Sequence, residues 1–113
     1  MAIRTINVKD GMPTADVALR RVNMALTLAK SQGDKALKLI HGYGSTGQGG
    51  VIRTQTRRYL AEQKNRGRLS AFIPGEAFSI FDEATLKAFG VCPALRQDSD
   101  LGRSNDGITI VIF

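Results

Sequence analysis

The sequence predicts a small α/β domain, a two-layer sandwich in which about four strands form a mixed sheet with two main helices. Short apolar runs alternate with longer stretches of helical periodicity through the first two thirds of the chain. A strand, a helix and a strand in that order imply a right-handed crossover between parallel strands. Residues 107–113 are apolar on both faces apart from Thr109, which is typical of a strand deep inside a sheet. We expect residues 1–113 to form one domain.

The first half of this pattern is strand, helix, strand. Residues 3–8 and 36–40 predict the two strands. Between them, Thr14 stands where an N-cap belongs, and apolar residues recur at helical spacing over the following turns. Gly33 is placed to end this helix in the left-handed conformation.

The second half begins with a helix that we expect to start after Gly50 and to end near Asn65. Its apolar stripe is narrow, and consists of Val51, Ile52, Thr56, Tyr59 and Leu60. Residues 69–73 predict a third strand. Asp82 can cap a short helix with Gly90 at its end, before a polar connection leads to the closing strand.

Charge is distributed unevenly along the chain. The net charge is +6, but residues 1–73 hold 13 of the 16 Lys and Arg against 4 acids, and residues 74–113 hold 3 against 6. A positive field of this kind favours a polyanionic partner, of which nucleic acid is the most natural. No stretch approaches the roughly 20 apolar residues of a membrane span. We expect a cytoplasmic protein with no membrane contact, in which the single Cys92 is a small buried hydrophobe.

The segment 40–53 is the strongest functional signal. Five of the 12 glycines fall between positions 42 and 50, after an apolar run that ends at His41 and before a basic helix. Glycines let the backbone approach a ligand closely, and a helix start offers unpaired N–H groups and the positive end of its dipole. The segment therefore predicts a phosphate site. Its expected backbone contacts are Gly42, Tyr43, Gly44, Ser45, Gly47, Gly49 and Gly50.

The helix after this segment is basic. Arg53, Arg57 and Arg58 can extend the phosphate site along a nucleic-acid strand, since each neutralised phosphate adds affinity and salt sensitivity. Arg53 and Arg57 are four residues apart, and like charges at that spacing weaken an isolated helix. The alternative interpretation is a solvated basic face without a ligand.

Other motifs leave further interpretations open. Residues 42–47 match the GxGxxG pattern of dinucleotide sites, but the next acid after a strand, Glu76, is much further on than the roughly 20 residues that such sites require. His41 is the only histidine, so a zinc site or a hydrolase triad is not expected. Asp98 and Asp100 are spaced like the first two ligands of a calcium loop, but the later ligands of such a loop are missing. We interpret these two residues as solvated loop residues.

The motif around His41 resembles the Smr domain, the small MutS-related module. Residues 40–45 are similar to the family's hydrophobic-His-Gly-x-Gly-Ser segment, Gly50 to Arg53 to the gly-x-leu-arg that follows it, and residues 107–111 to its closing strand. The resemblance implies a fold like the C-terminal domain of translation initiation factor three, and nucleic-acid binding. It also implies nicking or RNA-cleaving endonuclease activity, which several relatives show. The connection at 74–106 is longer than the family's usual one.

The family's first motif, leucine-aspartate-x-histidine-glycine, is degenerate in this chain. The matching stretch is residues 6–11, in which Asn7 replaces the acid, Lys9 or Asp10 replaces the histidine, and Gly11 is retained. An amide cannot serve as a base or as an anionic metal ligand, whereas Lys9 can bind a phosphate. If the protein cleaves, His41 is the expected proton-transfer residue, assisted weakly by Asp10.

These observations leave the partners and cofactors as follows. DNA or RNA is the expected ligand, and the acidic segment 74–106 could contact another protein. The sequence establishes no cofactor, and Mg²⁺ or Mn²⁺ is a candidate if the protein is a nuclease. An inactive binding module, a protein-interaction module and a nucleotide-cofactor protein remain as alternatives.

Overall fold

The computed structural model describes residues 3–42 and 49–113. Within these ranges the chain forms strands, α-helices and two short 3₁₀ helices in the order β1 (Ile3–Asn7), α1 (Ala15–Ser31), β2 (Ala36–Ile40), α2 (Gly49–Asn65), β3 (Ala71–Pro74), η1 (Gly75–Ala77), α3 (Glu83–Val91), η2 (Pro93–Gln97) and β4 (Ile108–Ile112). The third strand begins two residues later than predicted. None of the helices described is long and apolar enough to cross a membrane.

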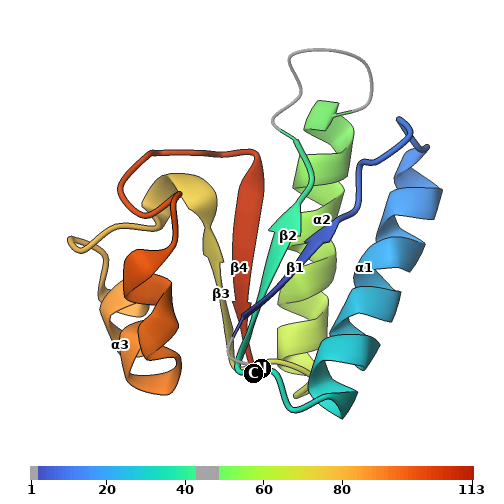
Figure 1. Cartoon of the computed structure of the whole chain (residues 1–113). Coiled ribbons are helices and arrows are strands. Elements are labelled where there is room, and N and C mark those ends of the chain that lie inside the picture. Colours follow the sequence, from blue (N-terminus) through green and yellow to red (C-terminus); the bar gives the residue numbers. More distant parts are fainter. Residues whose placement is uncertain (1–2, 43–48) are drawn as a thin grey trace.

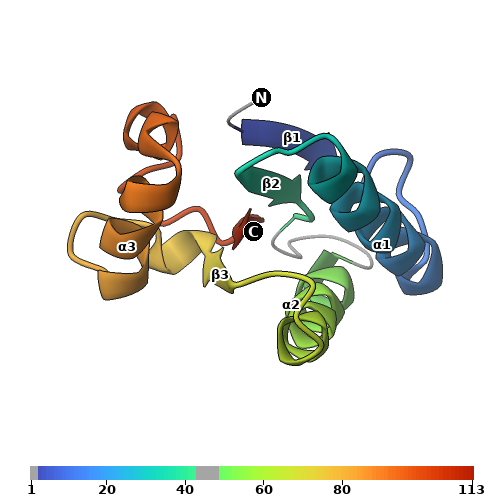
Figure 2. The same ribbon diagram turned by 90° about the horizontal axis from the view of Figure 1, so that it is seen from below.

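The strands form one mixed sheet in the order β1-β2-β4-β3. Strands β1 and β2 are parallel, as the crossover rule predicts, and β4 is antiparallel to both of its neighbours. Helices α1 and α2 cover one face, while α3 and η2 lie on the other (Figures 1 and 2). The predicted α/β class, mixed sheet and two main helices are confirmed, and α3 with η2 adds a smaller layer to the two that were expected.

Helix α1 has the two ends that the sequence predicts. The Thr14 hydroxyl accepts a hydrogen bond from the Val17 N–H at 3.3 Å, which makes Thr14 the N-cap. At the other end, Gly33 has φ +72°, and the Asp34 N–H bonds to the Ala29 carbonyl at 3.0 Å. This is the Schellman arrangement that favours glycine, because only glycine adopts positive φ without strain.

Helix α2 differs from its prediction at its first turn. It begins at Gly49, within the glycine segment, and the buried stripe is formed by Ile52, Thr56, Leu60 and Gln63. The prediction that Val51 belongs to this stripe is wrong, because its side chain is 46% exposed. Each helical residue turns by about 100°, so adjacent Val51 and Ile52 cannot both point to the centre of the same buried face.

Helix α3 begins as predicted, with Asp82 accepting a hydrogen bond from the Thr85 N–H at 2.9 Å. It does not end at Gly90 as expected. Gly90 is not among the glycines with positive φ, and the helix continues to Val91 with Cys92 as its C-cap. Cys92 is buried among the apolar side chains beneath α3, as predicted.

Strand β4 separates two hydrophobic cores. Its even-numbered residues Ile108, Ile110 and Ile112 pack with β3, α3 and η2, and Val111 packs with α1 and α2. All five residues of the strand are buried, which confirms the interior position predicted for it. A strand with a core on each face has to be apolar on both, so the hydroxyl of Thr109 needs a specific partner.

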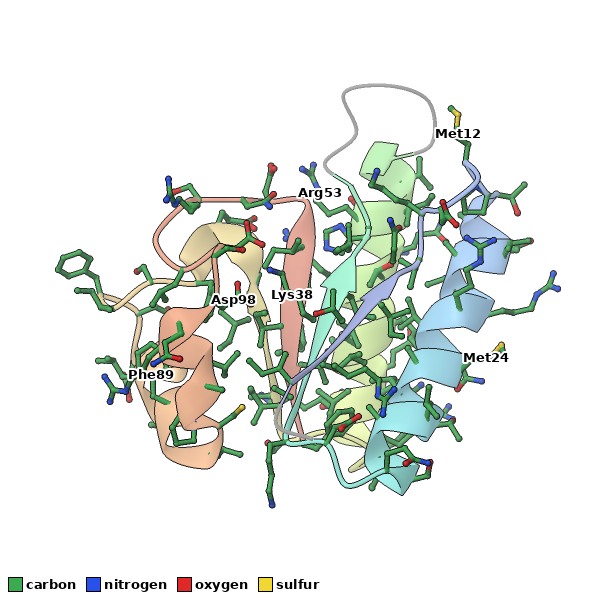
Figure 3. The ribbon with its side chains drawn as sticks, viewed as in Figure 1. Met12, Met24, Lys38, Arg53, Phe89 and Asp98 are labelled. Atoms are coloured by element: carbon green, nitrogen blue, oxygen red, sulfur yellow. The ribbon has the colours of Figure 1, made fainter. Side chains whose placement is uncertain are left out.

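The interpretation of Asp98 and Asp100 as solvated residues is wrong. Their carboxylates contact the ammonium of Lys38 in β2, at 2.9 Å and 2.5 Å respectively, and Figure 3 shows Lys38 beside Asp98. Burial alone would lower the pKa of Lys38, but its hydrogen bonds to both carboxylates and their charges outweigh burial and raise this pKa. Lys38 is 8% exposed. The connection between η2 and β4 is therefore attached to the sheet by a largely buried ion-pair network.

Replacing Lys38 by methionine should destabilise the protein by about 3 to 5 kcal/mol, because the change leaves two partly buried carboxylates without their cation. Urea unfolding at pH 7 measures this loss. Lys87→Met is the matched control: Lys87 pairs with Glu83 at 3.3 Å, both side chains are exposed, and the expected change is below about 1 kcal/mol. Equal effects of the two substitutions would show that Lys38 does not anchor the connection.

Candidate functional site

The candidate site lies at the edge of the sheet where β1 and β2 end. Because these strands are parallel and each leads into a helix, the first turns of α1 and α2 lie at the same end of the molecule (Figure 1). The first turn of α1 contains Asp16, whereas the first turn of α2 contains no acid. The positive end of the α2 dipole is therefore not offset by an acidic side chain in its own first turn.

His41 lies at this edge and is completely buried. Its Nδ1 is 2.8 Å from the carbonyl of Gly42, and its Nε2 is 2.8 Å from the hydroxyl of Thr109. A carbonyl only accepts, so Nδ1 carries the proton, and the neutral ring accepts at Nε2 from the Thr109 hydroxyl. Burial, followed by the nearby charges of Arg57 and Arg53, holds the pKa of His41 below its ordinary value, against the Gly42 hydrogen bond, which raises it.

Arg57 extends this hydrogen-bond chain to the acidic part of the sequence. Its Nε donates to the Thr109 hydroxyl at 3.2 Å, and its two terminal nitrogens each donate to one oxygen of Glu76 at 2.8 Å. The same guanidinium reaches the carbonyls of Asp106 and Ile108 at 3.3 Å. Burial would raise the pKa of Glu76, but its hydrogen bond and ion pair with Arg57 outweigh burial and lower this pKa.

The three arginines predicted to extend the phosphate site, Arg53, Arg57 and Arg58, differ in their partners. Arg53 donates to the Asp106 carboxylate at 2.9 Å, so Arg53 and Arg57 both have carboxylate partners within the protein. Arg58 is exposed and takes part in none of the ion pairs found in the described ranges. Sequence reasoning did not identify Thr109, Glu76 or Asp106 as site residues. Thr109 did carry a signal, since it is the one polar residue in an otherwise apolar strand.

Lys9 and Gly42 lie close together. Gly42 has φ +79°, and a Cβ placed on it would lie 3.0 Å from Cδ of Lys9, so the lysine stem crosses directly over this glycine. The Lys9 N–H is fixed by the Asn7 side-chain oxygen at 2.9 Å. Asp10 is exposed on the same loop, and its carbonyl accepts from Arg21 at 2.6 Å.

The remaining predicted contacts are distributed as follows. Gly49 and Gly50 form the start of α2, where the first amides of a helix lack intrahelical acceptors. The predictions for Tyr43, Gly44, Ser45 and Gly47 fall outside the described residues. Within 3–42 and 49–113, no group of three or more His, Cys, Asp or Glu side chains is placed to hold a metal ion.

Comparison with known proteins identifies the fold. A family model of the Smr domain matches residues 10–77. The crystal structure of the Smr domain of Thermus thermophilus MutS2 superposes with a TM-score of 0.53 and 22% sequence identity, over 99% of this chain and 96% of that one. No curated protein sequence matches. The identity to the crystal structure is low, so that likeness concerns the fold alone.

The lowered pKa of His41 predicts that stability decreases on acidification. The unfolded chain takes up a proton near pH 6.5, whereas the folded chain resists it until lower pH. The contribution is therefore complete above about pH 6.5 and is lost as pH falls through the folded pKa, by at most about 1.4 kcal/mol per pH unit. Urea unfolding between pH 5 and 7 measures this slope, and His41→Asn should reduce it. A ring-proton NMR titration of His41 with a midpoint at or above 6.5 would contradict the prediction.

Proposed function

This chain belongs to the Smr domain family, and from that premise we propose that it binds the phosphate backbone of DNA or RNA at the edge of the sheet where β1 and β2 end. The observation that carries the proposal is the convergence of Lys9, Gly42 and the acid-free first turn of α2 at this edge. Ligands of open α/β sheets commonly bind beyond the carboxyl ends of the strands. A helix start next to a lysine is suited to a phosphate.

We assign different tasks to the basic residues. Lys9 is exposed and lies over Gly42, so it makes the first contact with a phosphate, and amides of the glycine segment 42–50 complete that contact. Arg58 extends the contact along the strand, because it is exposed. Arg53 and Arg57 contribute positive potential but mainly hold their carboxylate partners. Contacts of this kind recognise the backbone and not the base sequence.

We propose that the protein binds without cleaving. In the described structure His41 is fully buried, and both ring nitrogens are engaged inside the protein. Proton transfer to a substrate would require this arrangement to open first. Asp10 is exposed, but the chain lacks the acid and the histidine of the family's first motif, and within 3–42 and 49–113 no group of three or more His, Cys, Asp or Glu side chains is placed to hold a metal ion. The cytoplasm is the proposed location.

Two other functions have weaker support. A nucleotide-cofactor site would need an acid that is free to hold a ribose, whereas both oxygens of Glu76 accept from Arg57. A protein partner for the acidic segment 74–106 is supported by the exposed side chains of Ile80 and Phe81, which are 57% and 91% exposed. This second function is compatible with nucleic-acid binding on the opposite side of the sheet.

Replacing Lys9 by glutamine should weaken binding to DNA of any sequence by a similar factor and should reduce the slope of log K against log salt by about 0.9 for duplex DNA. Fluorescence anisotropy at several salt concentrations measures both quantities. Lys87→Gln serves as the control, because it removes the same charge from α3 on the other face of the sheet. If the two variants show the same slope, Lys9 does not contact a phosphate.

Binding and cleavage are separated by incubating the protein with supercoiled plasmid and with a structured RNA, with Mg²⁺, with Mn²⁺ or with chelator. We expect shifted but intact substrates, both for the wild type and for Asp10→Asn. New ends produced by the wild type but not by His41→Ala would show that the protein is a nuclease and would assign the chemistry to His41. Absence of both shift and cleavage would reject nucleic-acid binding itself.

A further inference from the structure

A groove of about 450 Å³ lies between α1 and α2. Its walls come from four residues of α1, with Tyr59 of α2 opposite them. The lining residues are Asp16, Leu19, Arg20, Asn23 and Tyr59. Leu19 and Tyr59 are partly exposed, and Arg20 is exposed. The groove therefore combines two apolar walls with a polar and charged rim.

The ring of Tyr59 is fixed in place from its hydroxyl end. The hydroxyl donates to the side-chain oxygen of Asn23 at 3.0 Å. Arg68 donates to the same Asn23 oxygen at 2.9 Å, to the Tyr59 oxygen at 3.3 Å and to Gln63 at 2.8 Å. It also reaches the hydroxyl of Thr27 at 3.1 Å. These four partners of Arg68 are uncharged, so the cluster joins α1 to α2 and leaves a positive charge beside the ring.

A fixed aromatic wall with a polar rim suits a flat ligand that has hydrogen-bonding edges. We infer that this groove takes one unpaired base of a single-stranded nucleic acid, stacked on Tyr59, with Arg20 beside the strand's backbone. The inference rests on the proposed function, and it adds a preference for single strands. Bases in a duplex are paired and stacked on one another, whereas unpaired bases can stack on aromatic side chains. Asp16 and Asn23 supply acceptor and donor groups for the edge of the base.

The position of the groove relative to the phosphate site agrees with this assignment. Asp16 is the second residue of α1, so one end of the groove lies at the sheet edge that carries Lys9 and Gly42. Tyr59 is ten residues from the start of α2, a distance of about 15 Å along the helix. Even at the roughly 3.4 Å per nucleotide of a strand in duplex DNA, the two sites lie within a few nucleotides of each other. One short strand can therefore reach both.

The test compares one labelled oligonucleotide as a single strand and as a duplex, using the whole chain and fluorescence anisotropy. Tyr59→Leu should weaken single-strand binding by about 5- to 100-fold and duplex binding by less than about 2-fold, because only the unpaired base loses its stacking partner. Tyr59→Phe keeps the ring but removes the hydroxyl that fixes it, so its loss of single-strand binding should be smaller than that of Tyr59→Leu. Arg20→Gln, at an exposed position, should weaken single-strand binding more than duplex binding. Equal losses on both substrates, or no loss, would overturn the inference.

A second measurement does not depend on how Tyr59→Leu folds. The chain has two tyrosines and no tryptophan, so Tyr43→Phe leaves Tyr59 as the only tyrosine fluorophore. A single strand should quench its emission, whereas inorganic polyphosphate, a polyanion without bases, should bind without quenching. Binding of both without quenching by the single strand would reject the base site and leave the phosphate site intact. Binding of neither nucleic acid nor polyphosphate would reject the proposed function and, with it, this inference.

Discussion

The hydrogen-bond chain from Glu76 through Arg57 and Thr109 to His41 is the interaction on which the rest of the site depends. It joins four separate segments of the sequence, and it ends at the carbonyl of Gly42, where the glycine segment begins. Each polar group in it is largely buried or is held by a charged partner. Removing one member would leave another buried polar group unsatisfied, which costs more than the bond itself contributes. These hydrogen bonds therefore connect the carbonyl of Gly42 to β4 and α2.

Lys38 of β2 and Arg57 of α2 connect the basic first two thirds of the chain to the acidic residues 74–113. Arg57 holds Glu76 beyond the end of β3, and Lys38 holds Asp98 and Asp100 on the other face of the sheet. From the sequence, Arg57 was expected to contact a phosphate, and Asp98 and Asp100 were expected to be solvated. Each of these side chains instead has a charged partner inside the protein. Exposed cations outside these ion pairs include Lys9 on its loop, Arg20 on α1 and Arg58 on α2.

The internal pairing of these charges and the burial of His41 determine which chemistry the site can perform. A histidine that is neutral, buried and bonded at both nitrogens is suited to fixing a loop, while an exposed lysine over a glycine is suited to receiving an anion. The fixed ring of Tyr59 adds a flat surface on the same side of the sheet. Together these features fit the proposed binding of a charged strand, which needs no proton transfer.

The sequence by itself determined the class of fold, the ends of α1 and the interior position of β4. Those features follow from local rules: hydrophobic period, the hydroxyl of Thr14 as a cap, and the ability of Gly33 to take positive φ. It also placed His41 at the end of the second strand's apolar run. Only the tertiary structure decided that His41 is buried and that Arg57 is paired. Those outcomes depend on Thr109 and Glu76, which are distant from His41 and Arg57 in the sequence. Local residue spacing does not indicate which distant side chain will pair with a charge.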